Sequence, residues 1–228
     1  MWRSKNRLRH AGPEICVIST KAAISQMVLI SRLAAELAFL KGRTSAQARQ
    51  GLLRDLLLLP ERVKEVVIGR QANLRRLAER YGHRHNWFFL GRGAYTPIAF
   101  ESALKLKEVT YLHAEGMPAG FLKHGTLSLI EESVPSVFLV PPPKEEGLFQ
   151  LTMSSAEEVR ARKGTVIGFT FGGEREVFDE VVHLPEVPAW TAPLLHLVAG
   201  QLLAYETAVA LGRDVDHPRS LAKSVTVS

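Results

Sequence analysis

Four short runs of β-branched and aromatic residues, with helical patterns between most of them, constrain the fold of this chain most strongly. The runs are Trp87–Leu90, Ser136–Val140, Thr165–Thr170 and Glu180–Leu184, and the helical patterns cover about 97–114, 147–162 and 190–212. Short, continuously apolar strands that alternate with helices are typical of a parallel sheet buried on both faces. The sequence therefore predicts an α/β fold, a parallel sheet flanked by helices.

The composition is that of a soluble globular protein with room for one sizeable core or two small domains. Apolar residues make up 46% and charged residues 23% of the 228 positions, which are ordinary values. Part of the net charge of +6 comes from the basic run Trp2–His10, but no nucleic-acid-binding motif accompanies it, so no nucleic-acid partner is expected. The single cysteine, Cys16, excludes an intrachain disulfide and a multi-cysteine metal site. This usage predicts a reducing compartment, the cytoplasm.

The N-terminal part of the chain is expected to be helical. One helix should cover about 20–41, and two more should cover Ser45–Leu59 and Glu61–Tyr81. Pro60 lies between the last two, and a proline is unfavourable inside a helix. Three helices are therefore expected before the first strand.

The longest apolar stretch, Ala22–Leu40, is interrupted by Gln26, Arg32 and Glu36. These polar residues favour a buried or interfacial helix over a membrane span. No signal peptide is expected either, since an apolar segment does not follow the basic start. One stripe of this helix consists of Ala23, Met27, Ile30, Ala34 and Leu37. We expect this stripe to be apolar surface through which the chain associates.

Glu101, Lys105 and Glu108 are the first candidate site residues. Their spacing of i, i+4 and i+7 places carboxylate, ammonium and carboxylate on one stripe of a helix. A solvated helix face with salt bridges explains the same pattern. His124, which precedes Gly125, adds a side chain that exchanges protons near neutral pH, although a lone histidine is also compatible with a surface or capping role.

Gly91-Arg92-Gly93 follows the first predicted strand and leads into the helix that carries Glu101. In parallel sheets, ligands bind at the carboxyl ends of the strands, so the charged stripe is expected to begin at that edge. Three residues alone are a weak signal for a phosphate-binding loop. A tight strand-to-helix turn explains it equally well.

Several segments together resemble glucosamine-6-phosphate synthase, the isomerising glutamine–fructose-6-phosphate aminotransferase family. The similar segments are 11–21, Gly91–Gly93, Ala103–Glu108, His113–Glu115, Gly120–Gly125 and Asp214–Val227. They follow the family's order and extend from about residue 11 to the end of the chain. The resemblance is to the C-terminal sugar-isomerase (SIS) part, and it implies the flavodoxin-like SIS fold.

The resemblance implies a reaction in which ammonia from glutamine adds at C2 of fructose 6-phosphate and a ketose-to-aldose isomerisation gives glucosamine 6-phosphate. By this resemblance, Glu108 moves the proton between C1 and C2, and Lys223 forms a Schiff base with the open-chain keto sugar. His124, from the neighbouring subunit of a homodimer, opens the sugar ring. Lys105 stabilises oxygen charge as the enediol-like species develops. No cofactor and no metal are expected, and Glu101 has no implied chemical role.

Parts of the family's pattern do not occur in this sequence. No cysteine follows the first methionine, so glutaminase activity is not expected, and the serine- and threonine-rich loops that grip the sugar phosphate are missing. Val17 and Ser19 are the only residues expected to remain of that half of the pocket. We therefore divide the chain into an unmatched segment, 1–10, a helical remnant of a first SIS domain with connecting helices, 11–77, a second SIS domain, 78–218, and a C-terminal catalytic loop, 219–228.

Three functional interpretations stay open from the sequence. The first is an isomerase half that uses ammonia or a separately encoded partner that supplies the missing loops. The second is a non-catalytic sugar-phosphate sensor, in which Glu108 and Lys223 would be dispensable for binding. The third is an inactive gene remnant that folds poorly.

Overall fold

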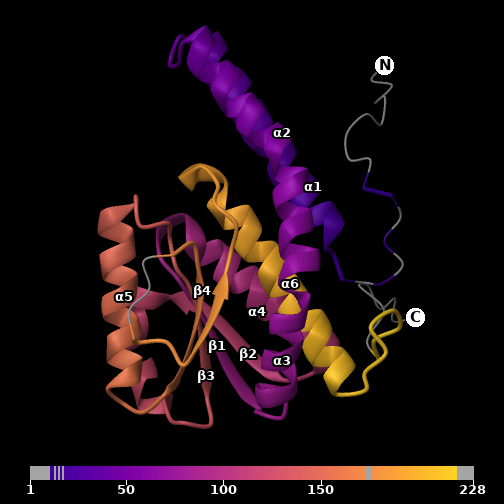
Figure 1. The fold of residues 1–228 in the computed structure, drawn as a ribbon, viewed down its shortest axis with the longest axis vertical. Coiled ribbons are helices and arrows are strands. Elements are labelled where there is room, and N and C mark those ends of the chain that lie inside the picture. The colour runs from indigo at the N-terminus through magenta and orange to yellow at the C-terminus, as the bar shows by residue number, and fades with distance from the viewer. Residues whose placement is uncertain (1–10, 13, 15, 17, 173–175, 220–228) are drawn as a thin grey trace, which may run out of the picture.

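The computed structural model describes residues 11–12, 14, 16, 18–172 and 176–219, so Val17, Lys223 and segment 1–10 lie outside the described residues. Its centre is a sheet of 5 parallel strands in the order β2-β1-β3-β4-β5 (Figure 1). The strands are β1 (Asn86–Gly91), β2 (His113–Pro118), β3 (Pro135–Leu139), β4 (Thr165–Thr170) and β5 (Glu180–His183). The predicted parallel α/β fold is confirmed, and each of the four predicted strand runs forms a strand.

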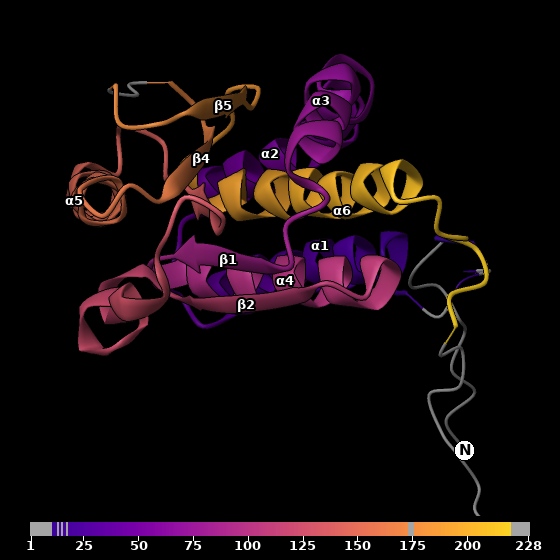
Figure 2. The ribbon, with the colours of Figure 1, turned by 90° about the horizontal axis from the view of Figure 1, so that it is seen from below.

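Helices cover both faces of the sheet. On one face lie α4 (Thr96–Thr110) and α6 (Ala192–Ala210), with α3 (Gln71–Tyr81) packed on α6 from the other side (Figure 2). The other face is covered by α5 (Glu146–Arg160) together with the short helices η2 (Ala119–His124) and η3 (Thr126–Leu129). Alternate residues of β1 point to opposite sides, so Trp87 and Phe89 enter one core while Phe88 and Leu90 enter the other.

The strand β2 was not expected, because the helical pattern was extended to about residue 114. The helix α4 instead ends at Thr110, and Tyr111 adopts a left-handed backbone conformation with φ 65°. The strand that follows is an edge strand whose His113 and Glu115 are exposed. Of its six residues, Ala114 and Met117 are buried, so it lacks the continuous apolar run of β1, β3 and β4.

The helices α1 (Lys21–Leu40) and α2 (Ala46–Gly69) form a hairpin that projects from the body of the molecule (Figure 1). The predicted break at Pro60 is wrong, since α2 continues through it for nine further residues. Leu56 and Leu59 on one side of the proline and Val66 on the other are all buried. Because one buried face continues across the proline, packing compensates for the lost backbone hydrogen bond. The chain breaks instead at Arg70, between α2 and α3.

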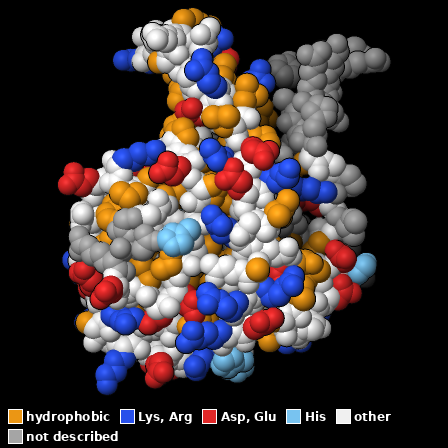
Figure 3. All heavy atoms as spheres, in the orientation of Figure 1, with side chains coloured by type: hydrophobic (Ala, Val, Ile, Leu, Met, Phe, Trp, Pro, Cys, Tyr) orange, Lys and Arg blue, Asp and Glu red, His pale blue; other side chains and the backbone are white. Residues whose placement is uncertain are grey.

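The helix α1 is less buried than expected. Ala35 is its only described residue in the buried class, whereas Ile30, Leu33, Leu37 and Leu40 are at least half exposed. Apolar side chains are accordingly visible on the projecting hairpin in Figure 3. By length and composition alone, α1 is apolar enough to cross a membrane, a test that core helices of soluble proteins also pass. Of the predicted stripe, Ala23 and Met27 are half-buried and the later members are exposed.

The exposed apolar side of α1 generates the first prediction. The chain should self-associate in solution, because a contiguous apolar surface of this kind is unfavourable in water. Replacing Leu33 and Leu37, which are 52% and 54% exposed, by glutamate should lower the association measured by light scattering. Gln26→Glu, at an exposed polar position of the same helix, should leave it unchanged. An unmodified chain that remains monomeric at every concentration contradicts this prediction.

Two buried carboxylates attach α3 to the rest of the domain. Glu206 of α6 is 1% exposed and accepts hydrogen bonds from Gln71 Nε2 at 2.8 Å and Arg75 Nε at 3.0 Å. Glu180, the first residue of β5, is 7% exposed and binds both Arg76 and Arg80. A buried carboxylate is tolerated only when such charged donors surround it. The position of α3 therefore depends on these ion pairs.

Removal of the carboxylate in Glu206→Ala should lower the free energy of unfolding by about 2 kcal/mol, because Gln71 and Arg75 lose their acceptor while Arg75 stays partly hydrated. Glu65→Ala is the matched control. It removes the Arg62–Glu65 pair, whose side chains are both 40% exposed, and should cost less than about 1 kcal/mol. Urea unfolding of both variants measures the difference. Equal losses in the two variants would show that burial of Glu206 is unimportant.

Candidate active site

The charged stripe of α4 forms a compact triad around a buried lysine. Lys105 is 3% exposed, and its Nζ lies 2.7 Å from Glu108 Oε2 and 3.3 Å from Glu101 Oε1. Both carboxylates are half-buried. The salt bridges of the predicted helix face are thus present. The prediction that this face is solvated is wrong, because the Lys105 ammonium is enclosed. An enclosed ammonium fixes the position of the Glu108 carboxylate more firmly than a solvated one.

The Lys105–Glu108 pair lies between two cavities. Lys105 lines a cavity of about 170 Å³ together with Cys16, Thr20 and Asp216. Glu108 lines a neighbouring cavity of about 400 Å³, and Ile18 belongs to both. The pair is therefore accessible from a hollow that is bounded by α4, the segment before α1 and the segment after α6.

The aromatic residue Tyr111 attaches the C-terminal segment beside Glu108, a role that the sequence did not reveal. Its hydroxyl oxygen accepts a hydrogen bond from the Arg219 backbone N–H at 2.7 Å, and the Arg219 guanidinium lies 4.0 Å from the centre of the ring. Arg213 lies over the same ring at 5.3 Å. Tyr111 and Arg219 both line the Glu108 cavity. Lys223 is outside the described residues, but the chain four positions before it lies at this cavity.

Two residues that the sequence analysis did not assign to chemistry also line the Glu108 cavity. These are Lys107 and His113, and both are exposed. His113 Nδ1 lies 3.1 Å from Asn86 Oδ1, which attaches the start of β2 to the start of β1. The sequence signal that could have identified these two residues is their closeness to the candidate residue Glu108, which lies two residues before the end of α4.

His124 lies away from the pair. It is exposed at the end of η2, after the carboxyl end of β2, whereas Glu108 lies near the end of α4, before the amino end of β2. Six strand residues at about 3.3 Å each separate the two ends by roughly 20 Å. The helix α4 begins after the carboxyl end of β1, at the edge where the stripe was expected to begin, and it runs antiparallel to the strands, so Glu108 in its last turn lies at the opposite edge.

The tripeptide Gly91-Arg92-Gly93 forms a tight turn. A Cβ on Gly91 would lie 2.3 Å from the Tyr95 carbonyl oxygen, so only glycine fits. The Arg92 side chain donates to the Leu151 carbonyl at 3.1 Å and to Ser155 Oγ at 2.8 Å. These bonds connect the turn to α5. The structure thus favours the strand-to-helix turn over the phosphate loop.

The segment before α1 is held in place by Glu14. Its Oε1 accepts from the backbone amides of Thr20 at 2.8 Å and Ala22 at 3.0 Å. Burial opposes ionisation, but these amides, with Ser19, hold the pKa of Glu14 below its usual value. Glu14 thus caps α1, because the side chain of the N-cap residue Thr20 makes no capping hydrogen bond. Ser19 is half-buried in this segment, between two residues that line the cavities.

Comparison with known proteins assigns the family. Residues 81–211 match the model of the SIS domain. The chain belongs to the SIS domain family. The match includes Lys105, Glu108 and His124 but not the segment around Ser19.

The SIS-domain chain is also similar to longer, curated proteins named glutamine–fructose-6-phosphate aminotransferase (isomerizing). It is 45% identical to one from Thermus thermophilus over 221 residues, 96% of this chain and 36% of the relative. It is 44% identical to one from Gluconobacter oxydans, over 95% of this chain and 36% of the relative. The chain thus spans little more than a third of the length of these relatives. The resemblance seen in the sequence is confirmed.

A solved structure agrees with this match. The C-terminal domain of glucosamine-fructose-6-phosphate aminotransferase from Francisella tularensis superposes with a TM-score of 0.84 at 35% identity, over 91% of this chain and 58% of that one. A putative phosphosugar isomerase from Silicibacter pomeroyi superposes with a TM-score of 0.72 at 27% identity, over 90% of this chain and 57% of that one. Sugar-isomerase-type function is therefore supported for the SIS domain.

A second titratable cluster lies inside the SIS domain at the carboxyl edge of the sheet. His196 of α6 is fully buried, with Nε2 3.0 Å from the Phe169 carbonyl oxygen and Nδ1 3.2 Å from the Ala192 carbonyl oxygen. Its ring packs edge-on against Tyr95 and Phe171. Burial lowers the pKa of His196 to about 4, although the backbone carbonyls favour its charged form. This histidine is neutral at physiological pH.

The buried His196 predicts a loss of stability in mild acid. Its folded pKa lies below the unfolded value of about 6.5, so the unfolded chain binds a proton first as the pH falls. The free energy of unfolding should drop by about 2 kcal/mol between pH 7 and pH 5 from this residue alone. His196→Gln should flatten the dependence seen in urea titrations, and His83→Gln, at an exposed position, should preserve it. The same slope in both variants would contradict the assignment to His196.

Proposed function

We propose that this chain supplies the second half of the sugar-isomerase pocket of an isomerising aminotransferase, which converts fructose 6-phosphate and ammonia to glucosamine 6-phosphate in the cytoplasm. One observation carries the proposal. The Glu108 carboxylate lies 2.7 Å from a buried ammonium, at a cavity that the segments on both ends of the SIS domain also line. A carbon-bound proton is moved by a base held in one place, and this pair holds one.

Glu108 is the proposed base that moves the proton between C1 and C2 of the open-chain sugar. Its Oε2 contacts Lys105 and its half-buried carboxylate borders a cavity of about 400 Å³, within the range of small-molecule sites. As negative charge develops on the substrate oxygens, the Lys105 ammonium would stabilise it. This stabilisation is strong because Lys105 is withdrawn from water.

Lys223 is the proposed residue that forms the Schiff base with the keto carbon. Support comes from Arg219, which Tyr111 attaches to the Glu108 cavity, four positions before Lys223. Val17 and Ser19 are proposed to contact the substrate from the other side. Ile18, between them, is 6% exposed and lines both cavities.

His124 is proposed to open the sugar ring of a neighbouring subunit in a homodimer. In its own chain, His124 lies beyond the opposite end of β2 from Glu108, too far to act on the same sugar. Its imidazole is exposed and lies edge-on to Phe121, with ring centres 6.2 Å apart and Phe121 63% exposed. An exposed aromatic pair of this kind is suited to contact with another copy.

The curated relatives are longer than this chain, so a complete pocket requires further residues. We propose that the segment 11–77 is the end of a first SIS domain, that 78–218 is the second domain, and that 219–228 is the catalytic loop. The phosphate-binding loops of a complete pocket lie outside this sequence. Ammonia, rather than glutamine, would be the nitrogen source for this chain itself.

The test is reductive trapping. Incubation with fructose 6-phosphate and borohydride should add one sugar-phosphate mass at Lys223, because reduction makes the Schiff base permanent. Lys105 should stay unlabelled. Glu108→Gln should keep the adduct and abolish exchange of the C1 proton with solvent, since the amide keeps the shape and loses the base. His124→Ala should slow labelling by the ring-closed sugar and spare an open-chain analogue.

Glu101→Gln is the matched control. Glu101 contacts the same Lys105, at 3.3 Å, and is equally exposed, so its variant should retain both labelling and proton exchange. Loss of exchange in both variants would mean that Glu108 acts only through the ion pair. The alternative function, a non-catalytic sugar-phosphate sensor, predicts a rise in melting temperature with the sugar phosphate and no adduct at Lys223. That result would overturn the catalytic assignment.

A further inference from the structure

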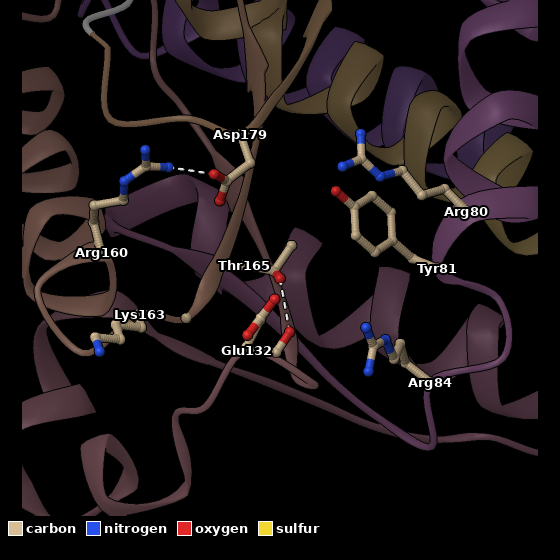
Figure 4. A pocket seen from close by; sticks show the side chains of 9 residues that line it. Arg80, Tyr81, Arg84, Glu132, Arg160, Lys163, Thr165 and Asp179 are labelled. Carbon is tan, nitrogen blue, oxygen red and sulfur yellow. Dashed lines mark hydrogen bonds and ion pairs between the residues drawn. The ribbon is translucent and has the colours of Figure 1, made fainter.

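A further cavity, about 420 Å³ in volume, lies at the amino edge of β4 and has no residue in common with the cavities beside Lys105 and Glu108. Side chains reach it from two directions (Figure 4). Arg80, Tyr81 and Arg84 come from the end of α3 and the loop after it, whereas Arg160 and Lys163 come from the end of α5 and the following turn. In the view of Figure 3, Lys and Arg side chains gather on the lower part of the body.

The donors of this cavity are of two kinds. Arg80 and Arg160 have carboxylate partners, since Arg80 binds Glu180 and Arg160 binds Asp179. Asp179 is further occupied by the Val166 amide at 2.8 Å. These pairs fix two guanidinium groups at the wall of the cavity. Glu180 and Asp179 are thereby occupied, which leaves Glu132 as the other carboxylate that lines the cavity.

The remaining donors lack partners among the described residues. Arg84 Nε is buried and makes no hydrogen bond, and its guanidinium points into the cavity below the Tyr81 ring (Figure 4). The Tyr81 hydroxyl points into the cavity, and burial raises the pKa of this phenol, which keeps it protonated and able to donate. Lys163 lies at the rim, with a left-handed backbone at φ 59°. A buried donor without an acceptor is costly unless a ligand or water satisfies it.

The charge of the cavity is positive. Among its lining residues, the acids are Asp179, which is paired, and Glu132, which is exposed. With Glu180 and its second partner Arg76 included, five cations face three carboxylates. The surplus of two positive charges matches a phosphate dianion, and a guanidinium provides the paired donors that phosphate oxygens accept.

We propose that this cavity binds the phosphate group of a small phosphorylated molecule, at a site separate from the sugar pocket. Its volume lies in the range of about 300–1,000 Å³ that small-molecule sites occupy, so it has room for more than a single phosphate group. The ligand would connect the end of α3 to the end of α5. Its phosphate would accept from Arg84 and Tyr81 inside the cavity, and Lys163, whose side chain points away from the cavity centre in Figure 4, would add positive charge at the rim.

Calorimetric titration tests the proposal with inorganic phosphate, inorganic pyrophosphate, 3-phosphoglycerate and citrate as probes. One equivalent of a phosphorylated probe should bind saturably, and citrate should bind more weakly. The double variant Arg84→Gln, Lys163→Gln should weaken binding about tenfold or more, because two charged donors are lost. Arg54→Gln, which removes the same kind of charge from an exposed position of α2, should have no effect. Comparable weakening by Arg54→Gln would reveal diffuse attraction and overturn the site.

Two further comparisons separate this site from the sugar pocket and from a macromolecular partner. Glu108→Gln should bind the probes as the unmodified chain does, so failure of the proposed reaction leaves this result unaffected. In unmodified protein, the NMR signals of Gly164 and Thr165 should shift on addition of pyrophosphate, which tests the location even if Arg84→Gln fails to fold. Shifts confined to Ile18 and Leu112 would place the ligand in the sugar pocket. Tight binding of a short RNA without saturable binding of any small probe would also overturn the proposal.

Discussion

The packing of α4 between β2 and α6 is the constraint on which the rest of this domain depends. A Cβ on Gly116 would lie 2.4 Å from Phe100 Cα, and a Cβ on Gly200 would lie 2.4 Å from Ser102 Oγ. Both neighbours of α4 therefore approach to a distance that only glycine permits. This close approach fixes the position of α4 and, because the helix is rigid, also the positions of Lys105 and Glu108 further along it. The geometry of the site therefore depends on Gly116 and Gly200, two residues that take no part in the chemistry.

Most of the fold could be predicted because its central strands are buried on both faces. Such strands need continuous apolar runs, and β1, β3 and β4 have them. The edge strand β2 could not be predicted in this way, since it needs only Ala114 and Met117 in the core and pairs on one side alone. The break predicted at Pro60 failed for a different reason. The tendency of proline to end a helix was outweighed there by the burial of residues on both sides of the proline.

In the candidate site, only the contacts between residues of one helix, α4, could be predicted from the sequence. Helical spacing placed Glu101, Lys105 and Glu108 on a common face, and the structure shows their contacts. The burial of Lys105 was not predictable, because it results from segments around residues 16–20 and 215–216 that are distant in sequence. Tyr111 was missed for a similar reason. Its partner, Arg219, is 108 positions away, and no local pattern announces a hydrogen bond of that kind.

The cationic cavity follows from how α3 is attached to the domain. Arg76 and Arg80 are spaced i, i+4 and share Glu180, and Arg75 reaches Glu206, so this helix is docked by its basic residues. Arg84 would continue the same spacing. The helix ends at Tyr81, however, and the chain that follows turns toward β1, which directs Arg84 away from Glu180. The carboxylates that position α3, Glu180 and Glu206, are already occupied by the arginines of the helix. Arg84, just beyond the helix end, is therefore available to an anion from outside the chain.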